Sequence, residues 1–272
     1  MEKYFPPFYN IGVIKVKKLA YIHDLGGTET MDGHKIRPHL LYRSANLALV
    51  DLKDIEFLSS KYHIKHVIDL RTDDEIVDKD ETHIEAYMDR KHIPLFTNEE
   101  NPLINKETRL GILDNIVKSE GGVKKYMCDA YRLLISSPKA IEGYKQIFNM
   151  LINNVNNEGY LIHCTQGKDR TGIVLYLVLS SLGVSEEKIR KIYMSFNRHD
   201  IFKRIAIWMG MNIVVSPRKA VALNKILTAR HYYFDAALDE VKKSYGDINS
   251  YLNTVVGIKE SDIIALREKY LV

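Results

Sequence analysis

The stretch LIHCTQGKDRTGIVLYLVL, residues 161–179, constrains this chain more than any other. It places an apolar run of strand length before a short polar turn, and a long uncharged run after that turn. A strand that turns tightly into a helix exposes the first free N–H groups of the helix, where the helix dipole attracts anions. Gly167, in the middle of the turn, permits the backbone to curl so that successive N–H groups point inward. The stretch therefore predicts an anion-binding loop.

Cys164, one of only two cysteines in the chain, stands at the end of the predicted strand and is expected to face this loop. Cysteines at helix N-termini near positive charge have pKa values lowered to about 3.5–7.5, and the thiolate is the nucleophilic form. Arg170 follows after five intervening residues, and its planar fork suits two oxygens of a tetrahedral oxyanion. The Thr171 hydroxyl suits a hydrogen bond to a departing thiolate. The pattern predicts a phosphate-binding cup with Cys164 as its nucleophile.

Short apolar runs bounded by polar or turn residues predict four strands, at 39–44, 64–71, 91–96 and 159–164. Residues 51–62, between the first two runs, carry apolar side chains on roughly one helical face. A strand, a helix and a strand in this order indicate a crossover unit of a parallel sheet. We therefore expect an α/β fold with a central, mostly parallel sheet flanked by helices.

From residue 121 onward the pattern is mostly helical, with Ser137 and Ser185 as N-caps and Gly183 as a C-cap. No repeat, low-complexity tract or flexible linker divides the 272 residues, so we expect a single domain over 1–272 with additional helices at its C-terminal end. Residues 197–232 are apolar and Met-rich and then basic, which suits either core or a helical flap inserted near the site.

The net charge of +4 is small and spread along the chain, which argues against a nucleic-acid partner. Two cysteines are too few for a disulfide framework, so a reducing, cytoplasmic compartment is expected. The N-terminus lacks the pattern of a signal peptide, although a route of export without such a signal stays open. The longest uncharged stretch, 171–185, is shorter than the roughly 20 residues of a membrane span, so stable membrane insertion is not expected. We expect a monomer.

The segment HCTQGKDRTG matches the His-Cys, five-residue, Arg-Thr signature and resembles the protein tyrosine phosphatase superfamily. Its Lys-Asp-Arg version is similar to a bacterial branch of tyrosine phosphatases, some of which also act on phosphoinositides. The segments DLGGTETMDGHKIRPHLLYRSANL, VIDLRTDDEI, YMCDAYRLL and YGDINSYL also resemble parts of that branch. The resemblance covers most of the chain, but only the cysteine loop is highly specific.

The resemblance implies a tyrosine-phosphatase-like fold and a two-step hydrolysis with no metal and no cofactor. Cys164 would attack phosphorus and form a phosphocysteine, which water then hydrolyses. Arg170 and the loop would bind the phosphate, with Lys168 adding positive charge unless it is a solvated surface lysine. The loop residues expected to bind phosphate are Thr165, Gln166, Gly167, Lys168, Asp169 and Arg170.

The general acid that protonates the leaving oxygen is less clear from the sequence. A Trp-Pro-Asp motif is absent, because Met209 follows the single tryptophan, Trp208. Asp169 inside the loop is the favoured acid, and its alternative is a structural carboxylate that holds loop N–H groups and Arg170. Glu99 or Glu100, in the loop TNEEN, is a second option. Because phenol is a better leaving group than an aliphatic alcohol, phosphotyrosine is the first substrate expected and phosphoinositide the second.

Several other residues carry two interpretations each. His163 either tunes the thiolate through the backbone or is a satisfied buried histidine. Arg43 and Arg71 end predicted strands beside Cys164 and either order the loop or pair with Asp69, Asp73 or Asp74, pairing being favoured. Cys128 is either an inert buried thiol or a partner of oxidised Cys164. The basic residues expected on a solvated helix face, or against anionic lipid, are Arg218, Lys219, Lys225 and Arg230.

Two other classes of protein fit a reactive cysteine in a phosphate cup. A binding module without turnover would keep the cup, but such decoys usually lose the Cys or the Arg, and both are present here. A sulfur-transfer or redox enzyme would use the Cys without needing Arg170 and Thr171. A cysteine-dependent phosphatase that acts on phosphotyrosine, with dual or broad specificity possible, is therefore the leading hypothesis, and a phosphoinositide phosphatase is the alternative.

Overall fold

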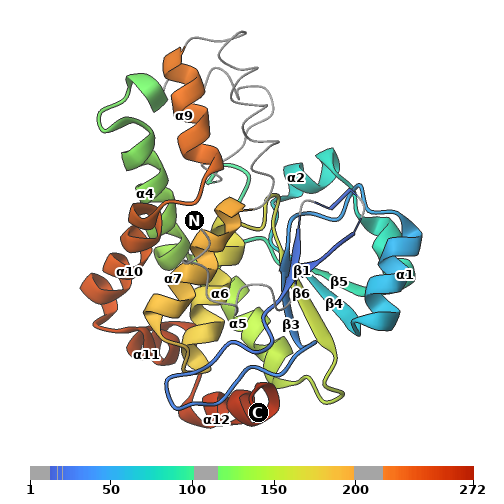
Figure 1. Cartoon of the computed structure of the whole chain (residues 1–272). Helices are drawn as coiled ribbons and strands as arrows, with labels where there is room; N and C mark the ends of the chain where they lie inside the picture. Colours follow the sequence, from blue (N-terminus) through green and yellow to red (C-terminus); the bar gives the residue numbers. More distant parts are fainter. Residues whose placement is uncertain (1–12, 17, 20, 101–115, 199–216) are drawn as a thin grey trace, which may run out of the picture.

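The structure is a computed structural model that describes residues 13–16, 18–19, 21–100, 116–198 and 217–272. Within these residues six strands form one sheet in the order β1-β2-β3-β6-β4-β5 (Figure 1). The strands are β1 Val13–Ile14, β2 Ile22–Asp24, β3 Leu41–Ser44, β4 Ile64–Asp69, β5 Asp89–His92 and β6 Gly159–His163. Strands β3, β6, β4 and β5 run parallel, and β1 and β2 add an antiparallel edge. The expected α/β fold with a mostly parallel sheet is confirmed.

Helices cover both faces of this sheet (Figure 1). Helices α1 and α2 lie toward one side, and the long helices from α4 onward lie toward the other. The first half of the chain contributes α1 Leu52–Lys61, α2 Asp73–Asp78 and the 3₁₀ turn η2 Thr82–Ala86. The second half contributes α4 Gly122–Ser136, α5 Pro138–Ile152, α6 Asp169–Ser181, α7 Glu186–Ser195, η4 Phe196–Arg198, α9 Pro217–Leu227, α10 His231–Tyr245, α11 Ile248–Tyr251, the π-turn η5 Leu252–Val256 and α12 Glu260–Tyr270.

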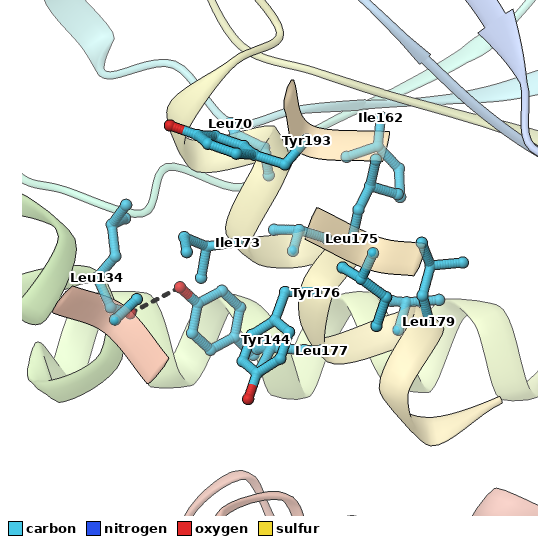
Figure 2. Close-up of a cluster of buried hydrophobic side chains, with 14 of the residues drawn as sticks. Leu70, Leu134, Tyr144, Ile162, Ile173, Leu175, Tyr176, Leu177, Leu179 and Tyr193 are labelled. Atoms are coloured by element: carbon cyan, nitrogen blue, oxygen red, sulfur yellow. Dashed lines mark hydrogen bonds between the residues drawn. The ribbon is translucent and has the colours of Figure 1, made fainter. Parts of the chain in front are cut away.

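Alternation along the strands divides the core into two parts, one on each face of the sheet. In β6, Leu161 packs in the smaller cluster with α1, and its neighbour Ile162 packs in the larger cluster with the C-terminal helices. Helix α6 lies at the centre of that larger cluster, where almost all of its residues are buried (Figure 2). The uncharged run of α6 from Thr171 onward suits this position, because that part of the helix has no solvent-facing side.

Local signals account for several helix ends in the second half of the chain. Ser185 caps α7 by accepting a hydrogen bond from the Lys188 N–H at 3.3 Å. Gly183 ends the preceding segment with a φ of +87°, in the left-handed region that favours glycine. Ser137 precedes α5 as expected, but its buried hydroxyl makes no hydrogen bond within the described residues, so Pro138 at the first helical position is the stronger signal.

One predicted strand is displaced along the chain. The apolar run at 91–96 predicted a strand there, whereas β5 covers Asp89–His92. Ile93, Leu95 and Phe96 are buried beyond the strand end, in the larger core cluster. Their burial comes from the loop after β5, so the apolar run marks packing rather than strand pairing.

The topology brings the expected site residues to one edge of the sheet. Strand β6 lies between β3 and β4, and its last residue, His163, pairs with Ser44 of β3 and Asp69 of β4. Cys164 follows directly, so it leaves the sheet between the carboxyl ends of two parallel neighbours. Ligands of open α/β sheets bind at such carboxyl ends.

Only part of the expected flap at 197–232 can be compared with the structure, because residues 199–216 lie outside the described residues. Helix α9 occupies the later part of that segment, and α10 begins at His231. The single-domain organisation stays a prediction. None of the described helices is long and apolar enough to cross a membrane.

Candidate active site

The loop after Cys164 turns its carbonyl groups outward onto fixed donors. The Tyr21 hydroxyl donates to the Gly167 carbonyl at 2.6 Å and to the Gln166 carbonyl at 3.1 Å. Arg43 Nη2 donates to the same Gly167 carbonyl at 2.6 Å, and Asn46 Nδ2 donates to the Thr165 carbonyl at 2.7 Å. Because C=O and N–H point to opposite sides of a planar trans peptide, the N–H groups that follow these carbonyls point inward. The loop is thus shaped to bind an anion over Cys164.

Gly167 is required by this geometry. Its φ is +66°, and a Cβ atom at this position would lie 1.9 Å from the Ser44 carbonyl oxygen and 2.3 Å from the Tyr21 hydroxyl oxygen. No side chain fits there without moving β3 or the loop. The close approach also explains how the loop carbonyls reach Tyr21 and Arg43.

Arg170, in the first turn of α6, is held by a carboxylate from a distant segment. Both of its Nη atoms donate to Glu75 of α2, with Nη2 at 2.8 Å from Oε1. Nη1 also donates to the Leu70 carbonyl at 3.2 Å. The buried Nε–H has no acceptor among the described residues. Glu75 therefore binds the two Nη atoms of the guanidinium, and the Nε–H remains available to an oxyanion.

Glu75 also holds the start of the loop and its own helix. It accepts hydrogen bonds from the Thr165 hydroxyl and, at 2.9 Å, from the Thr72 N–H, which completes a capping box. Burial by itself would raise the pKa of this carboxyl, but the Arg170 charge and the hydrogen bonds outweigh burial and hold the pKa at about 2. Glu75 was not among the residues predicted from the sequence, and the Thr72-x-x-Glu75 spacing was the one signal that could have drawn attention to it.

Lys168 is fully buried and does not lie on the surface, so its interpretation as a solvated lysine is wrong. Its ammonium group donates to the Ile226 carbonyl at the end of α9 and to the Thr228 carbonyl at 3.4 Å. It also lies 3.3 Å from Asp169 Oδ1. Lys168 thus connects the phosphate loop with the C-terminal end of α9, where free carbonyl groups favour a cation.

Asp169 accepts a hydrogen bond from a buried tyrosine, Tyr131, and makes none with Arg170 among the described residues. Its Oδ1 atom accepts a 2.6 Å hydrogen bond from the Tyr131 hydroxyl of α4, and that hydroxyl lies 2.7 Å from the Tyr193 hydroxyl of α7. The structural alternative for Asp169, in which it held Arg170, does not match these contacts, because Glu75 holds Arg170. Neither Tyr131 nor Tyr193 was among the site residues predicted from the sequence.

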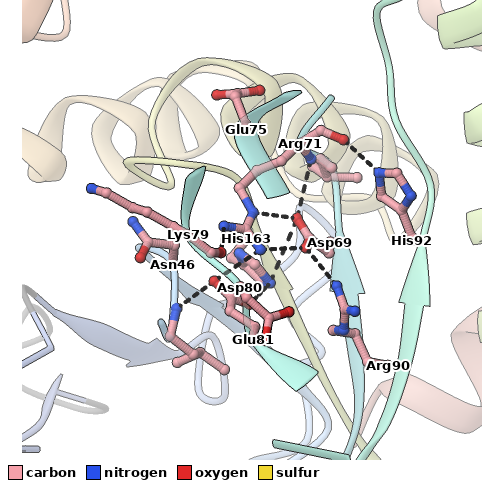
Figure 3. A network of polar contacts seen from close by, with 12 residues as sticks. Asn46, Asp69, Arg71, Glu75, Lys79, Asp80, Glu81, Arg90, His92 and His163 are labelled. Carbon is pink, nitrogen blue, oxygen red and sulfur yellow. Dashed lines mark hydrogen bonds and ion pairs between the residues drawn. The ribbon is translucent and has the colours of Figure 1, made fainter. Parts of the chain in front are cut away.

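His163, the residue before Cys164, belongs to a buried ionic network that joins the strand ends (Figure 3). Arg71 donates to both oxygens of Asp69 at 2.7–2.9 Å and lies 3.1 Å from Glu81 Oε1. Glu81 accepts from the Leu47 N–H at 2.9 Å and lies 3.3 Å from His163 Nε2. The network therefore fixes the chain after β3, β4 and β6 relative to one another. Burial opposes ionisation of Asp69, but His163 and Arg71 lower its pKa well below the ordinary value.

Asp69, Glu81 and His163 also bring three potential metal ligands within 4.8 Å of one another, all fully buried. The guanidinium of Arg71 already forms ion pairs with both carboxylates, at 2.7 Å from Asp69 and 3.1 Å from Glu81. A metal ion would have to displace this arginine. The donor set therefore fits a structural network better than a metal site.

The remaining cysteine-loop residues lie in positions compatible with their expected roles, which stay predictions. Cys164 is buried, and the His163 Nδ1 atom lies 3.3 Å from the Cys164 carbonyl oxygen, with the imidazole fully buried. The Thr171 hydroxyl is also fully buried and has no hydrogen-bond partner in the described part of the chain. A buried, unpaired hydroxyl at this place is available to a sulfur or an oxyanion.

Arg43 and Arg71 differ from each other. Arg71 pairs with Asp69 as expected, whereas Arg43 forms no ion pair with a described residue and orders the loop, which was the less favoured interpretation. Cys128 donates to the Tyr232 carbonyl, and burial raises the pKa of its thiol, as fits an inert buried cysteine. Arg218 and Lys225 are exposed, and Lys219 and Arg230 are half-buried.

Glu99 and Glu100, the alternative acids, lie in a turn that is closed by hydrogen bonds between Thr97 and Glu100. Glu100 accepts from the Thr97 N–H at 3.3 Å and donates its own N–H to the Thr97 hydroxyl at 3.1 Å. Glu99 is exposed. Neither carboxylate contacts a residue of the cysteine loop within the described residues. Of the three candidate acids, Asp169 is the one that lies in the cysteine loop.

Comparisons with known proteins agree with the geometry. The model of the tyrosine phosphatase family matches residues 14–272. A Cupriavidus necator protein named "Putative tyrosine-protein phosphatase" is 26% identical over 255 residues, which cover 93% of this chain and 86% of that protein. The triple specificity protein phosphatase PtpB of Mycobacterium tuberculosis is 28% identical over 152 residues, which cover 53% of this chain and 54% of that protein.

The family match extends far beyond the cysteine loop, to nearly the whole chain. It confirms the resemblance found in the sequence and, with it, the expected enzyme class of protein-tyrosine phosphatase, a phosphoric monoester hydrolase. The chain belongs to the tyrosine phosphatase family.

Proposed function

We propose that this chain hydrolyses phosphotyrosine in proteins through a phosphocysteine on Cys164. The observation that supports this most strongly is the loop itself, whose carbonyls are held outward by Tyr21, Arg43 and Asn46. The arrangement directs N–H groups toward the space over the buried sulfur. A tetrahedral dianion is the ligand that such a cup binds best.

In the first step Cys164 Sγ attacks phosphorus, the S–P bond forms, and the P–O bond to the tyrosine oxygen breaks. Asp169 donates its proton to that departing oxygen. In the second step a water oxygen attacks phosphorus and gives a proton to Asp169. The S–P bond breaks, inorganic phosphate leaves and the thiolate is restored.

The loop and Arg170 stabilise the charge that spreads over the equatorial oxygens in both steps. Glu75 keeps the guanidinium in place, so the Nε–H is oriented before substrate arrives. The Thr171 hydroxyl is free to donate to the sulfur when it is the leaving group in the second step. The buried ammonium group of Lys168 adds positive charge beside Asp169.

The range of substrates follows from the leaving group. Phenol leaves readily, with a pKa of about 10, whereas serine, threonine and inositol oxygens need more help from the acid. Phosphotyrosine is therefore the preferred substrate. The relative named a triple specificity phosphatase supports including phosphoserine, phosphothreonine and phosphoinositide in the test. A phosphoinositide phosphatase that uses the same loop is the alternative.

We also propose that the chain forms a single domain, 1–272, and that the described end of the segment 197–232, which contains α9, acts as a flap. The contact of Lys168 with the Ile226 and Thr228 carbonyls supports this, because it joins the end of α9 directly to the phosphate loop. A monomer and a cytoplasmic location remain proposals. Size-exclusion chromatography with light scattering tests the first of them.

Hydrolysis by the purified full chain tests the function. Wild type should release phosphate from a phosphotyrosine peptide in the presence of a chelator and should be inhibited by vanadate. Cys164→Ser should bind the peptide without turnover. Absence of turnover with peptide binding retained by the wild type would favour a binding module. Faster hydrolysis of a phosphoinositide than of any phosphopeptide would favour the lipid alternative.

A further inference from the structure

We propose that Tyr131 is a positioning residue that fixes the transferable proton of Asp169 on Oδ2. The inference rests on the proposed phosphatase function, in which Asp169 protonates the leaving oxygen. It adds a residue from α4, 38 positions away along the chain, to the chemistry of the cysteine loop. The reason lies in which oxygen of the carboxyl group is already occupied.

Two donors converge on the Oδ1 atom of Asp169. The Tyr131 hydroxyl lies 2.6 Å away, and the Lys168 ammonium group lies 3.3 Å away. A carboxyl oxygen that accepts an O–H hydrogen bond and faces a cation is a poor place for a proton. Oδ2 has no hydrogen-bond partner among the described residues, and a tenth of the Asp169 side chain remains exposed. The acidic proton is therefore confined to Oδ2.

The direction of the hydrogen bonds follows from the chemistry of the groups. An ionised carboxylate only accepts, so Tyr131 must donate its single proton to Asp169. Tyr193, 2.7 Å from Tyr131, must then donate to the Tyr131 oxygen. The donors thus run in one direction, from Tyr193 through Tyr131 to the carboxylate of Asp169.

Burial keeps this chain of donors protonated. Tyr131 is fully buried, and burial first, then the nearby Asp169 charge, raises the pKa of its hydroxyl well above the ordinary value. Burial and Asp169 raise the pKa of Tyr193 in the same direction. Neither tyrosine is expected to lose its proton in the range where the enzyme works, so the hydrogen bond to Oδ1 persists in both protonation states of Asp169.

The surrounding packing fixes the two rings. The Tyr131 ring lies edge-on to the Tyr193 ring and tilted against Tyr233, with centroids 6.2 Å and 5.8 Å apart. The Tyr193 ring stacks on Phe234 at 4.9 Å and approaches Gly172 of α6, where an added Cβ would lie 3.0 Å from a ring carbon. Gly172 therefore lets Tyr193 come close to the helix that carries Asp169. A fixed donor is what a precisely placed acid requires.

In the first step, the hydrogen bond from Tyr131 determines which carboxyl oxygen of Asp169 gives up the proton. As the P–O bond breaks, the proton on Oδ2 moves to the departing oxygen, and the negative charge left on Asp169 is shared with Oδ1. There the Tyr131 hydrogen bond strengthens, because its acceptor becomes charged. In the second step Oδ2 takes the proton of water and the same hydrogen bond relaxes.

Tyr131→Phe removes the hydroxyl and keeps the ring. Tyr144→Phe is the matched control, since Tyr144 is equally buried and donates to the Leu134 carbonyl at 2.7 Å, away from the loop (Figure 2). The measured quantity is kcat/KM of the full chain on a series of aryl phosphates whose phenols range from acidic to weakly acidic. Its dependence on leaving-group pKa reports proton donation in the first step. Thermal unfolding of each variant is measured in parallel.

We expect a shallow dependence for wild type and Tyr144→Phe, and a steep one for Asp169→Asn and Tyr131→Phe. Tyr131→Phe should lose about tenfold on phenyl phosphate, part of the roughly 10²- to 10⁴-fold that a general acid supplies, and less than about threefold on p-nitrophenyl phosphate. Adding Tyr131→Phe to Asp169→Asn should not steepen the dependence further. Tyr193→Phe should have a smaller effect of the same kind.

The results that would overturn the role of Tyr131 differ from those that would contradict the phosphatase function. An equal loss on all esters by Tyr131→Phe, or a dependence as shallow as that of wild type, would overturn the role of Tyr131. A shallow dependence for Asp169→Asn would overturn it too, because Asp169 would then not be the acid. Both outcomes leave the phosphatase function standing. Absence of turnover by the wild type would instead contradict the proposed function.

Discussion

The Glu75 carboxylate binds both Nη atoms of Arg170, with Oε1 at 2.8 Å from Nη2, and leaves the Nε–H without an acceptor among the described residues. The two residues come from α2 and α6, on different segments of the chain. The pair is almost completely buried, with side chains 4% and 2% exposed. Arg170 can bind a phosphate in a fixed orientation only while Glu75 holds its guanidinium in place. The first two predictions follow from this dependence.

Glu75→Gln should lower kcat/KM about tenfold or more and weaken vanadate binding, because Arg170 loses the charge that orients it. The variant should also be less stable by about 3–5 kcal/mol, the usual cost of breaking a buried ion pair. Steady-state kinetics and urea unfolding measure the two effects. Asp73→Asn, on the same helix but with a side chain 78% exposed, is the control and should behave like wild type. Wild-type kinetics for Glu75→Gln would refute the role of the pair.

The same carboxylate predicts a dependence of stability on pH. The pKa of Glu75 is lowered from 4.5 to about 2, so its contribution is complete above about pH 4.5 and is lost as pH falls toward 2. The shift corresponds to about 3 kcal/mol. The difference in unfolding free energy between wild type and Glu75→Gln should therefore narrow between pH 5 and pH 3, as measured by urea titration. A difference that stayed constant over this range would contradict the ionised pair.

Gly167→Ala should abolish activity, because the new Cβ would lie 1.9 Å from the Ser44 carbonyl oxygen and the loop could not keep its shape. Gly33→Ala is the control for backbone strain alone, since Gly33 also has a positive φ, +90°, but nothing lies within 4 Å of its added Cβ. The control should retain activity at a modest cost in stability. Phosphate release and thermal unfolding compare the two variants. Activity retained by Gly167→Ala would show that the loop does not need this close approach.

Lys168→Met should loosen α9 as well as weaken phosphate binding. The substitution keeps an unbranched side chain but removes the donors to the Ile226 and Thr228 carbonyls. Hydrogen exchange in α9 should become faster, while exchange in α5 stays unchanged. Lys225→Met, at an exposed position of the same helix, is the control and should not change exchange in α9. Unaltered protection of α9 in Lys168→Met would rule out the connection.

The sequence was most informative where one segment carries a complete signal. The run from Leu161 to Leu179 contains its own strand, turn and helix, and the structure has β6, the loop and α6 there. Ser185 and Gly183 likewise act on neighbouring backbone groups. Such local patterns can be recognised without knowledge of the fold, because all of their partners lie within a few residues.

Hydrogen-bond partners that come from distant segments of the chain could not be recognised from the sequence in this way. Glu75 lies 95 positions from Arg170, and Tyr131 lies 38 positions from Asp169. Nothing in either segment indicates which arginine or carboxylate it will meet, because that depends on how the sheet brings the segments together. The strands β1 and β2 were missed for a different reason. They are two and three residues long, too short for an alternating pattern to be recognised.

The most direct measurement is the covalent state of Cys164 during turnover. Wild-type protein is mixed with a phosphotyrosine peptide, quenched within the first turnovers and digested for mass spectrometry. The account predicts one phosphoryl group on the peptide that contains Cys164, absent in Cys164→Ser and absent after the substrate is exhausted. A phosphoryl group on another residue, or full turnover by Cys164→Ser, would contradict it.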